Sequence, residues 1–155
     1  MAVETAEGYV KVIVFQLKDE EYAIEVDDVQ SIEKMQAVTR IPGVEPYIIG
    51  VMNLRGVITP VMDLRKRFEL ESRPYDEATR ILVLKRDNSD IGFIVDGAND
   101  VMDIAASNIE PTPEVVGGVA EEYLRGVIKL EERLFTLLHI DKILNKQDDK
   151  QRSGM

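Results

Sequence analysis

The sequence contains no cysteine and only one histidine among its 155 residues. Without cysteine the chain has no disulfide framework, no thiolate nucleophile and no thiolate zinc site, and it fits a reducing compartment such as the cytoplasm. No apolar run approaches the roughly 20 residues that a membrane-spanning helix needs. Residues 1–8 also lack the basic and then apolar pattern of a secretory signal, so we expect neither export nor membrane insertion.

Basic residues are also scarce. The chain has 19 lysines and arginines against 29 aspartates and glutamates, which gives a net charge of -10. Affinity for nucleic acid depends largely on cations that neutralise phosphates, so nucleic acid is not an expected partner. The one basic cluster, Arg65-Lys66-Arg67, follows an aspartate suited to starting a helix, and we expect its cations on the solvated outer face of that helix.

Residues that could carry catalysis do not gather in a recognisable pattern. His139 is alone within an apolar stretch, where a single histidine is more often packed or exposed than catalytic. Paired glutamates fall where turns or polar helices are expected, and no phosphate-binding glycine motif occurs. We therefore expect no enzyme activity, no metal site and no cofactor.

Short stretches rich in β-branched residues, separated by polar turns, predict an all-β, or mainly β, protein. The expected strands cover residues 10–17, 22–26, 38–41, 48–54, 57–62, 80–84 and 91–95. After the second of them, Asp27 predicts a short helical segment in which Val29 and Ile32 share one face. The pattern alone leaves open whether these two side chains are buried in the protein's own core or against a partner.

The segment from Gly50 to Arg65 carries the clearest functional signal. Two apolar runs are joined by the turn Asn53-Leu54-Arg55-Gly56, and asparagine and glycine tolerate the positive φ of a tight turn. A hairpin here holds Arg55 outward on a rigid tip, where it suits contact with a partner. Arg55 can instead support the hairpin from within the protein, and the sequence does not decide between these roles.

A similar layout returns near the C-terminus, which indicates an internal duplication. Gly50-Val51-Met52 matches Gly126-Val127-Ile128, and each half closes on a short helix led by aspartate, at Asp63 and Asp141. Six or so short strands per half fit a small closed barrel, because closure removes exposed strand edges. We expect two small barrels side by side.

The chain resembles the CheW family of bacterial chemotaxis coupling proteins from about Tyr9 to Leu144. The strongest shared motif is Gly50-x-x-Asn53-Leu54-Arg55-Gly56-x-x-x-Pro60-Val61-x-Asp63-Leu64-Arg65. Further matches are Glu21-Tyr22-x-Ile24, Val29-Gln30-x-Ile32, Gly92-x-x-Val95-Asp96, Asp100-Val101 and Tyr123-Leu124-x-Gly126. Such a set in one order is far more specific than any single piece.

The resemblance implies two SH3-like five-stranded β-barrel lobes packed together, with short helices that include one near the C-terminus. It implies a single domain over residues 9–145, with lobes at approximately 20–70 and 78–145. The strand at 10–17 is assigned to neither lobe. Flexible tails are expected at residues 1–8 and 146–155.

The resemblance also implies an adaptor without catalytic activity. Proteins of this family link the cytoplasmic tips of methyl-accepting chemotaxis receptors to the regulatory domain of the histidine kinase CheA, in receptor arrays beneath the inner membrane. The receptor tip would lie as a helix in a groove near the junction of the lobes. Carried onto this sequence, the receptor-facing residues are Val29, Ser31, Gly50, Asn53, Arg55, Gly92 and Val101, and the kinase-binding residues are unknown.

Some relatives carry an acidic residue at the position of Ser31, so no charge contact is assigned there. The same module also occurs in CheV-like proteins with a receiver domain and inside the kinase. This sequence carries neither addition, so we expect a free-standing coupler. In a different class, an acidic two-barrel protein could be an enzyme or a small-ligand carrier that uses the cleft between its lobes.

Overall fold

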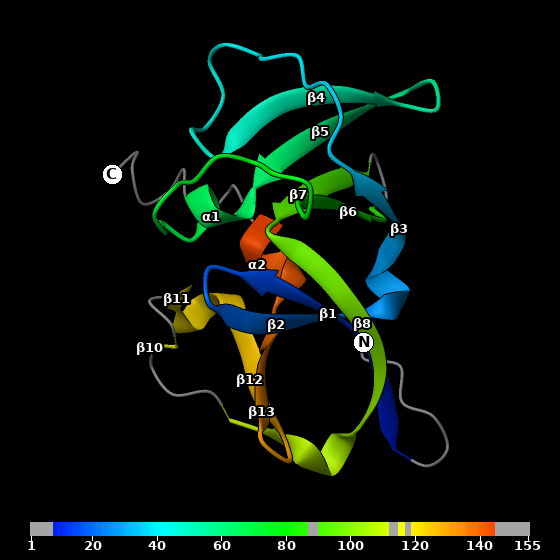
Figure 1. The fold of residues 1–155 in the computed structure, drawn as a ribbon, viewed down its shortest axis with the longest axis vertical. Helices are drawn as coiled ribbons and strands as arrows, with labels where there is room; N and C mark the ends of the chain where they lie inside the picture. The colour runs from blue at the N-terminus through cyan, green and yellow to red at the C-terminus, as the bar shows by residue number, and fades with distance from the viewer. Residues whose placement is uncertain (1–7, 87–89, 112–114, 117–118, 145–155) are drawn as a thin grey trace.

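The structure, a computed structural model, describes residues 8–86, 90–111, 115–116 and 119–144. These residues form two mixed sheets and a two-stranded ribbon, with short helices between them (Figure 1). The first sheet has the order β8 (Gly97–Ala105), β1 (Tyr9–Leu17), β2 (Glu20–Glu25), β13 (Arg133–Leu138), β12 (Leu124–Leu130) and β9 (Ile109–Glu110). The second has the order β3 (Val29–Lys34), β6 (Arg80–Leu84), β7 (Ile91–Val95), β5 (Val57–Asp63) and β4 (Ile48–Leu54).

The remaining elements are short. The ribbon pairs β10 (Val115–Val116) with β11 (Val119–Ala120). The helices are α1 (Leu64–Arg67) and α2 (Ile140–Leu144), and the 3-10 turns are η1 (Val26–Asp28), η2 (Ala106–Asn108) and η3 (Glu121–Tyr123). We name the two halves of the molecule the β1 lobe and the β4 lobe, after a strand in each of the two large sheets.

The mainly β fold predicted from the sequence is confirmed, and six predicted strands appear as β1, β2, β4, β5, β6 and β7. Residues 38–41 do not form a strand, but Thr39 exchanges two backbone hydrogen bonds with Val51 of β4, at 2.8 and 2.9 Å. This bridge joins the chain after β3 to the far edge of the second sheet. The predicted helices near Asp63 and Asp141 are α1 and α2, whereas the predicted tails lie outside the described residues except for Gly8.

The helical segment predicted after Asp27 is wrong, because only the turn η1 forms there and residues 29–34 are strand β3. Val29 and Ile32 nevertheless share a face. The pairing with β6 shifts by one residue between Val29 and Ser31, which is a β-bulge, and it places Val29 opposite Leu84 and Ile32 opposite Leu82. Residues directly opposite in an antiparallel pair point to the same side of the sheet, so the bulge produces the spacing that resembled a helix.

The two lobes are not the two sequence halves, so the predicted division at 20–70 and 78–145 is wrong. Strands β1 and β2 pair with the C-terminal strands, and β6 and β7 pair with β3 and β5. Two parallel pairings, β2 with β13 and β5 with β7, join the two repeats within each lobe. Each lobe therefore contains strands from both halves of the chain.

This arrangement gives three hydrophobic cores among the residues that the structure describes. Val12, Ile128 and Phe135 belong to the core of the β1 lobe, and Met52 and Ile81 belong to the core of the β4 lobe. The largest core lies where the lobes meet and is shared by both of them. Its members include Phe15, Leu17, Tyr22, Ile24, Met62, Leu64, Phe68, Leu82, Leu84, Phe93, Tyr123 and Ile143.

The repeat is visible in the two long hairpins, which shift register at equivalent glycines. The shift lies between Ile48 and Gly50 in β4, and between Leu124 and Gly126 in β12. A β-carbon on Gly50 would lie 2.0 Å from the carbonyl oxygen of Thr39, so only glycine permits this approach of the two backbones.

Gly50→Ala should therefore lower the free energy of unfolding by about 3 kcal/mol, because the new methyl group collides with the Thr39 backbone. Gly43→Ala is the matched control. Gly43 has φ +81 but no atom within 4 Å of its position for a β-carbon, so only a backbone cost of about 1 kcal/mol is expected. Urea unfolding of both variants checks this, and equal losses would contradict the steric explanation.

Candidate partner-binding surface

The β4–β5 hairpin tip is built from the residues that the sequence singled out. The backbone amide of Gly56 donates to Asn53 Oδ1 at 2.8 Å, which closes the turn. Arg55 occupies the left-handed region at φ +53, and its side chain is 64% exposed. Its Nη2 lies 3.0 Å from Glu33 Oε2 on strand β3. Arg55 is thus both exposed to a partner and held by its own protein.

Glu33 is the acidic partner that sequence reasoning missed. Ser31, two residues earlier on β3, and Arg55 both lower the pKa of Glu33 by stabilising its carboxylate. The Glu33 side chain is only 17% exposed, so most of its surface is already occupied. The ion pair fixes the hairpin tip against β3.

Two of the predicted receptor-facing residues, Gly50 and Gly92, are buried. A β-carbon on Gly92 would lie 2.7 Å from Ile81 Cγ2, within the core of the β4 lobe. Neither glycine carries a side chain, although Gly50 borders a groove on the β4 lobe. Direct receptor contact at these two positions stays a prediction, and their burial favours a role in the shape of the barrel.

Exposed aliphatic side chains lie at the margin of the shared core. Val101 on β8 is 59% exposed and lies opposite Ile13 of β1. On its other side, Ile13 pairs with Ile24 of β2, which belongs to the shared core. Ile32 on β3 is 43% exposed and is opposite Leu82, also in the shared core. Each set of paired residues therefore leads from an exposed side chain on the end strand of a sheet to the shared core between the lobes.

Strands β3 and β8 lie on the same side of the molecule (Figure 1). We call Ile32 and Val101, with the half-buried Val29 that packs on the shared core, the β3–β8 margin. Two further exposed aliphatic residues lie beside Arg55 and were not expected from the sequence, Val57 at 57% and Ile58 at 61% exposed. Their position directly after the hairpin turn could have indicated this exposure from the sequence.

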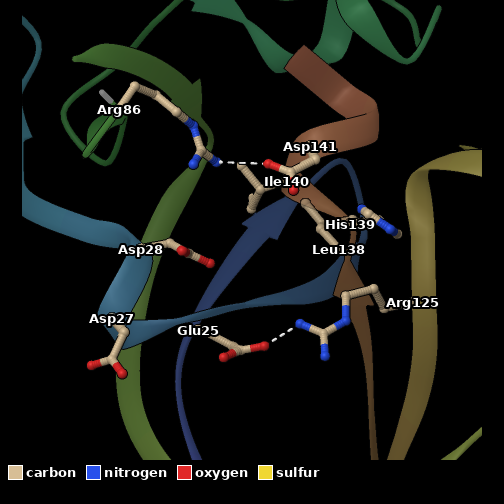
Figure 2. A pocket seen from close by; sticks show the side chains of 9 residues that line it. All are labelled: Glu25, Asp27, Asp28, Arg86, Arg125, Leu138, His139, Ile140 and Asp141. Carbon is tan, nitrogen blue, oxygen red and sulfur yellow. Dashed lines mark hydrogen bonds and ion pairs between the residues drawn. The ribbon is translucent and has the colours of Figure 1, made fainter. Parts of the chain in front are cut away.

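A polar pocket of about 350 Å³ lies at the junction of the lobes (Figure 2). Glu25, only 6% exposed, forms an ion pair with Arg125, and Arg86 lies 3.6 Å from Asp141. Burial and then the nearby Glu25 raise the pKa of Asp28, which also lines the pocket.

The pocket is an ionic junction with the half-buried His139 on its wall. Its other described lining residues are carboxylates, arginines, Leu138 and Ile140, and none of these carries a hydroxyl or a thiol. Within the described ranges, no three histidine or acidic side chains are placed to hold a metal ion. The chemistry that this arrangement supports is charge pairing, within the β1 lobe at Glu25–Arg125 and between the lobes at Arg86–Asp141.

The basic cluster of α1 is not solvated as predicted, because Arg65 is 7% exposed and Arg67 is 5% exposed; only Lys66 faces solvent. Asp63 caps the helix and accepts from the Arg65 amide at 2.9 Å and the Lys66 amide at 3.3 Å. This cap turns the two arginines inward, toward the space between the lobes.

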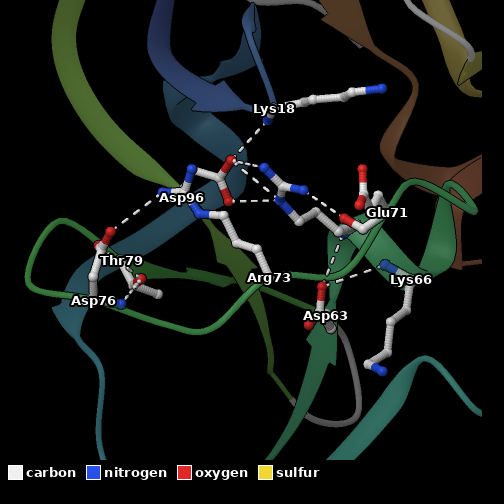
Figure 3. Close-up of polar contacts among 9 residues, drawn as sticks. Lys18, Asp63, Lys66, Glu71, Arg73, Asp76, Thr79 and Asp96 are labelled. Atoms are coloured by element: carbon white, nitrogen blue, oxygen red, sulfur yellow. Dashed lines mark hydrogen bonds and ion pairs between the residues drawn. The ribbon is translucent and has the colours of Figure 1, made fainter.

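Asp96, labelled in Figure 3, lies in the connection from β7 to β8 and accepts hydrogen bonds from Arg65. Arg65 Nε and Nη2 donate to its two carboxylate oxygens at 3.0 and 2.7 Å, and the Lys18 amide of the β1–β2 turn donates at 2.7 Å. Burial acts to raise the pKa of Asp96, but the hydrogen bonds from Arg65 and Lys18 outweigh it and leave the pKa below its ordinary value.

Arg67 makes the second connection. Its guanidinium carbon lies 4.6 Å from the ring centre of Tyr47, just before β4, and 5.0 Å from that of Tyr123 in η3. Its Nε donates to the carbonyl oxygen of Ile143 in α2 at 2.8 Å. One short helix of the β4 lobe therefore contacts the β1 lobe through two buried cations.

Comparison with known proteins identifies the class. A family model described as CheW-like domain matches residues 11–148. The chain is 45% identical over 140 residues to the chemotaxis protein CheW of Bacillus subtilis, covering 90% of each chain. It is 41% identical over 136 residues to that of Klebsiella aerogenes, covering 88% of this chain and 82% of the relative.

A solved structure agrees with these sequences. The scaffolding protein TtCheW from Thermoanaerobacter tengcongensis superposes with a TM-score of 0.81 at 31% identity, covering 88% of this chain and 92% of that one. The chain therefore belongs to the CheW-like family of chemotaxis scaffold proteins. The resemblance inferred from the sequence and the two-lobed fold are confirmed. Neither α1 nor α2 is long and apolar enough to cross a membrane, nor is any other helix in the described part of the chain.

Glu33→Gln should release Arg55 and let the hairpin tip open more often. The Arg55 side of this ion pair is 64% exposed and solvated, so the pair contributes little to global stability, and the free energy of unfolding should change by less than about 1 kcal/mol. Amide hydrogen exchange at residues 53–56 should become faster. Glu132→Gln, an exposed carboxylate on the other long hairpin, is the control, and unchanged exchange in Glu33→Gln would disprove the role of the pair.

Asp96→Asn should lower the free energy of unfolding by about 3 kcal/mol at neutral pH, because it leaves Arg65 buried without a carboxylate. The folded-state pKa of Asp96 lies below its ordinary value of 3.8. The contribution of its carboxylate to the free energy of unfolding is therefore complete above pH 3.8 and is lost as the pH falls through the folded-state pKa. The difference between wild type and variant should shrink below about pH 4. Urea unfolding across pH 2–7 tests this, and a difference independent of pH would refute it.

Proposed function

We propose that the protein is a non-enzymatic adaptor that links methyl-accepting chemotaxis receptors to the histidine kinase CheA. Membership of a family of chemotaxis scaffold proteins supports this role. The observation that carries the proposal is the β3–β8 margin, where Ile32 and Val101 expose aliphatic surface at the edge of the shared core. Two apolar positions on different lobes suit the apolar face of an amphipathic receptor helix.

The proposed receptor surface refines the residues expected from the resemblance. Val101 and Ile32 make direct apolar contacts, and Arg55 offers an exposed cation to a receptor carboxylate. Val29, Ser31 and Asn53 shape this surface from β3 and from the hairpin turn. The buried glycines preserve the barrel and make no contact of their own.

The proposed mechanism is control by position. An adaptor that holds receptor and kinase in one assembly raises their effective concentration and fixes their geometry. A small movement of the receptor can then bias the kinase between two arrangements, provided that the adaptor does not absorb the movement. We propose that the two lobes act as one domain over residues 9–145, in the cytoplasm at receptor arrays. The buried contacts of Arg65 and Arg67 give such a domain the required stiffness.

Val101→Asp and Ile32→Asp should each weaken binding of a receptor signalling fragment by about tenfold or more, because a charge replaces an apolar contact. Arg55→Ala should weaken it by a smaller factor. Co-sedimentation with the receptor fragment and the kinase, scored for complex formation and autophosphorylation, measures both effects. Val29→Asp is a poorer test, because Val29 packs on the shared core.

Leu134→Asp is the matched control, since Leu134 is a 50% exposed aliphatic residue near the other hairpin tip. It should bind the receptor fragment as wild type does. Equal losses in Leu134→Asp and Val101→Asp would exclude a specific β3–β8 surface. Failure of a folded wild-type sample to bind either partner would overturn the adaptor function.

A further inference from the structure

Arg133 lies directly after the turn of the β12–β13 hairpin and contacts two other strands of its sheet. Its Nη2 lies 2.9 Å from Glu21 Oε2 on β2 and 3.3 Å from Asp100 Oδ2 on β8. Its guanidinium carbon lies 4.7 Å from the ring centre of Phe135, a fully buried residue. One side chain therefore connects the hairpin tip to the strand at the end of the sheet.

These charged groups lie on the inner face of the β1 lobe. Asp100 is opposite Val14 of β1, and Glu21 is opposite Phe135 of β13. Val14 and Phe135 both belong to the core of this lobe, and opposite residues on paired strands point to the same side of a sheet. Arg133 is two positions before Phe135 on the same strand, so it shares that face. The ion pairs of Arg133 therefore lie against one end of this core.

Asp100 also follows a β-bulge. The register of β8 against β1 shifts just before Asp100, which leaves Asn99 as the extra residue of the bulge. Because side chains alternate along a strand, an inward Asp100 leaves Val101 pointing outward, and Val101 is 59% exposed. A slip of one residue at the bulge would exchange the two faces of β8. The contact between Asp100 and Arg133 opposes this slip.

The β4 lobe contains the same arrangement. Strand β3 has Gln30 as the extra residue of its own bulge, and Ile32 is its exposed aliphatic residue. Glu33, next to Ile32, is opposite Ile81 of the β4 lobe core and pairs with Arg55 of the β4–β5 hairpin. In each lobe an arginine of the long hairpin thus holds an inward carboxylate of the end strand, beside an exposed aliphatic side chain.

The two lobes reach this arrangement from different positions. Arg55 lies within its hairpin turn, whereas Arg133 is the first residue of the strand after the turn. On the end strands, Glu33 follows the exposed aliphatic residue and Asp100 precedes it. The shared feature is therefore the contact between hairpin and end strand, and both contacts hold the strands that form the β3–β8 margin.

We propose that Arg133 is a positioning residue for the receptor surface, which fixes the register of β8 through Asp100 and so keeps Val101 outward at the β3–β8 margin. The proposal rests on the adaptor function, because that function gives Val101 its partner. Arg133 acts through β8 and does not contact the receptor. Its guanidinium is already engaged by Glu21 and Asp100 and packs on the ring of Phe135.

Arg133→Gln should weaken binding of a receptor signalling fragment several-fold and leave binding of the regulatory domain of the kinase unchanged. The loss is modest because partly exposed ion pairs are individually weak. Amide hydrogen exchange of β8 should become faster in the free protein. Arg133→Lys, which keeps the charge, should recover part of both effects. Lys129→Gln, which removes an exposed cation from β12 of the same hairpin, is the matched control and should change neither.

A double-mutant cycle separates positioning from direct contact. If Arg133 acts through Val101, the loss of receptor affinity caused by Arg133→Gln should nearly vanish in a Val101→Ala background. Losses that multiply would show that Arg133 contacts the receptor itself or acts through overall stability, and would overturn the proposal. Asp100→Asn removes the same contact from the β8 side and should reproduce the faster exchange, which provides a second variant if Arg133→Gln does not fold.

Failure of this proposal is distinguishable from failure of the adaptor function. Unchanged receptor affinity in Arg133→Gln, beside a wild type that binds, would overturn the positioning role and leave the adaptor function intact. A folded wild type that binds neither receptor nor kinase would overturn the adaptor function and the receptor role of Arg133 together. Hydrogen exchange needs no partner, so unchanged exchange of β8 in Arg133→Gln would by itself refute the hold of Arg133 on this strand.

Discussion

The placement of one lobe on the other depends on two buried arginines in a helix of four residues. Arg65 reaches the carboxylate of Asp96, and Arg67 lies between two tyrosines while donating to the C-terminal end of α2. A buried guanidinium is costly to desolvate unless its donors are matched, so these contacts favour one orientation strongly over neighbouring ones. The shared apolar core supplies most of the favourable contact between the lobes, but the hydrophobic effect is non-directional and does not by itself select one orientation.

This division of labour suits the proposed adaptor function. The β3–β8 margin borders the shared core. A partner bound at this margin, as proposed, would contact residues whose positions depend on the inter-lobe geometry. Fixed geometry is the property that a scaffold without chemistry of its own has to offer, because its effect on other proteins is exerted by position.

The sequence predicted the elements well and their assembly less well. The hairpin from Gly50, the cap at Asp63 and most strands follow from local rules of turn and strand formation. The burial of Arg65 and Arg67 was missed because four helical residues are too few to show an apolar face. Val29 and Ile32 were read as helical because a spacing of three is shared by a helix and a bulged strand. The exchange of strands between lobes depends on pairings that no local pattern encodes.

The interleaving of the two repeats has a consequence for biosynthesis. Arg133 of β13 contacts Glu21 of β2, 112 positions earlier in the chain, and the parallel pairing beside it completes the β1 lobe. Strands β1 and β2 leave the ribosome first, yet their lobe cannot close until the last strand has been made. The β4 lobe, whose strands lie between residues 29 and 95, can form earlier. The nascent chain thus carries an unfinished sheet edge through most of translation, which exposes it to misassociation during that interval.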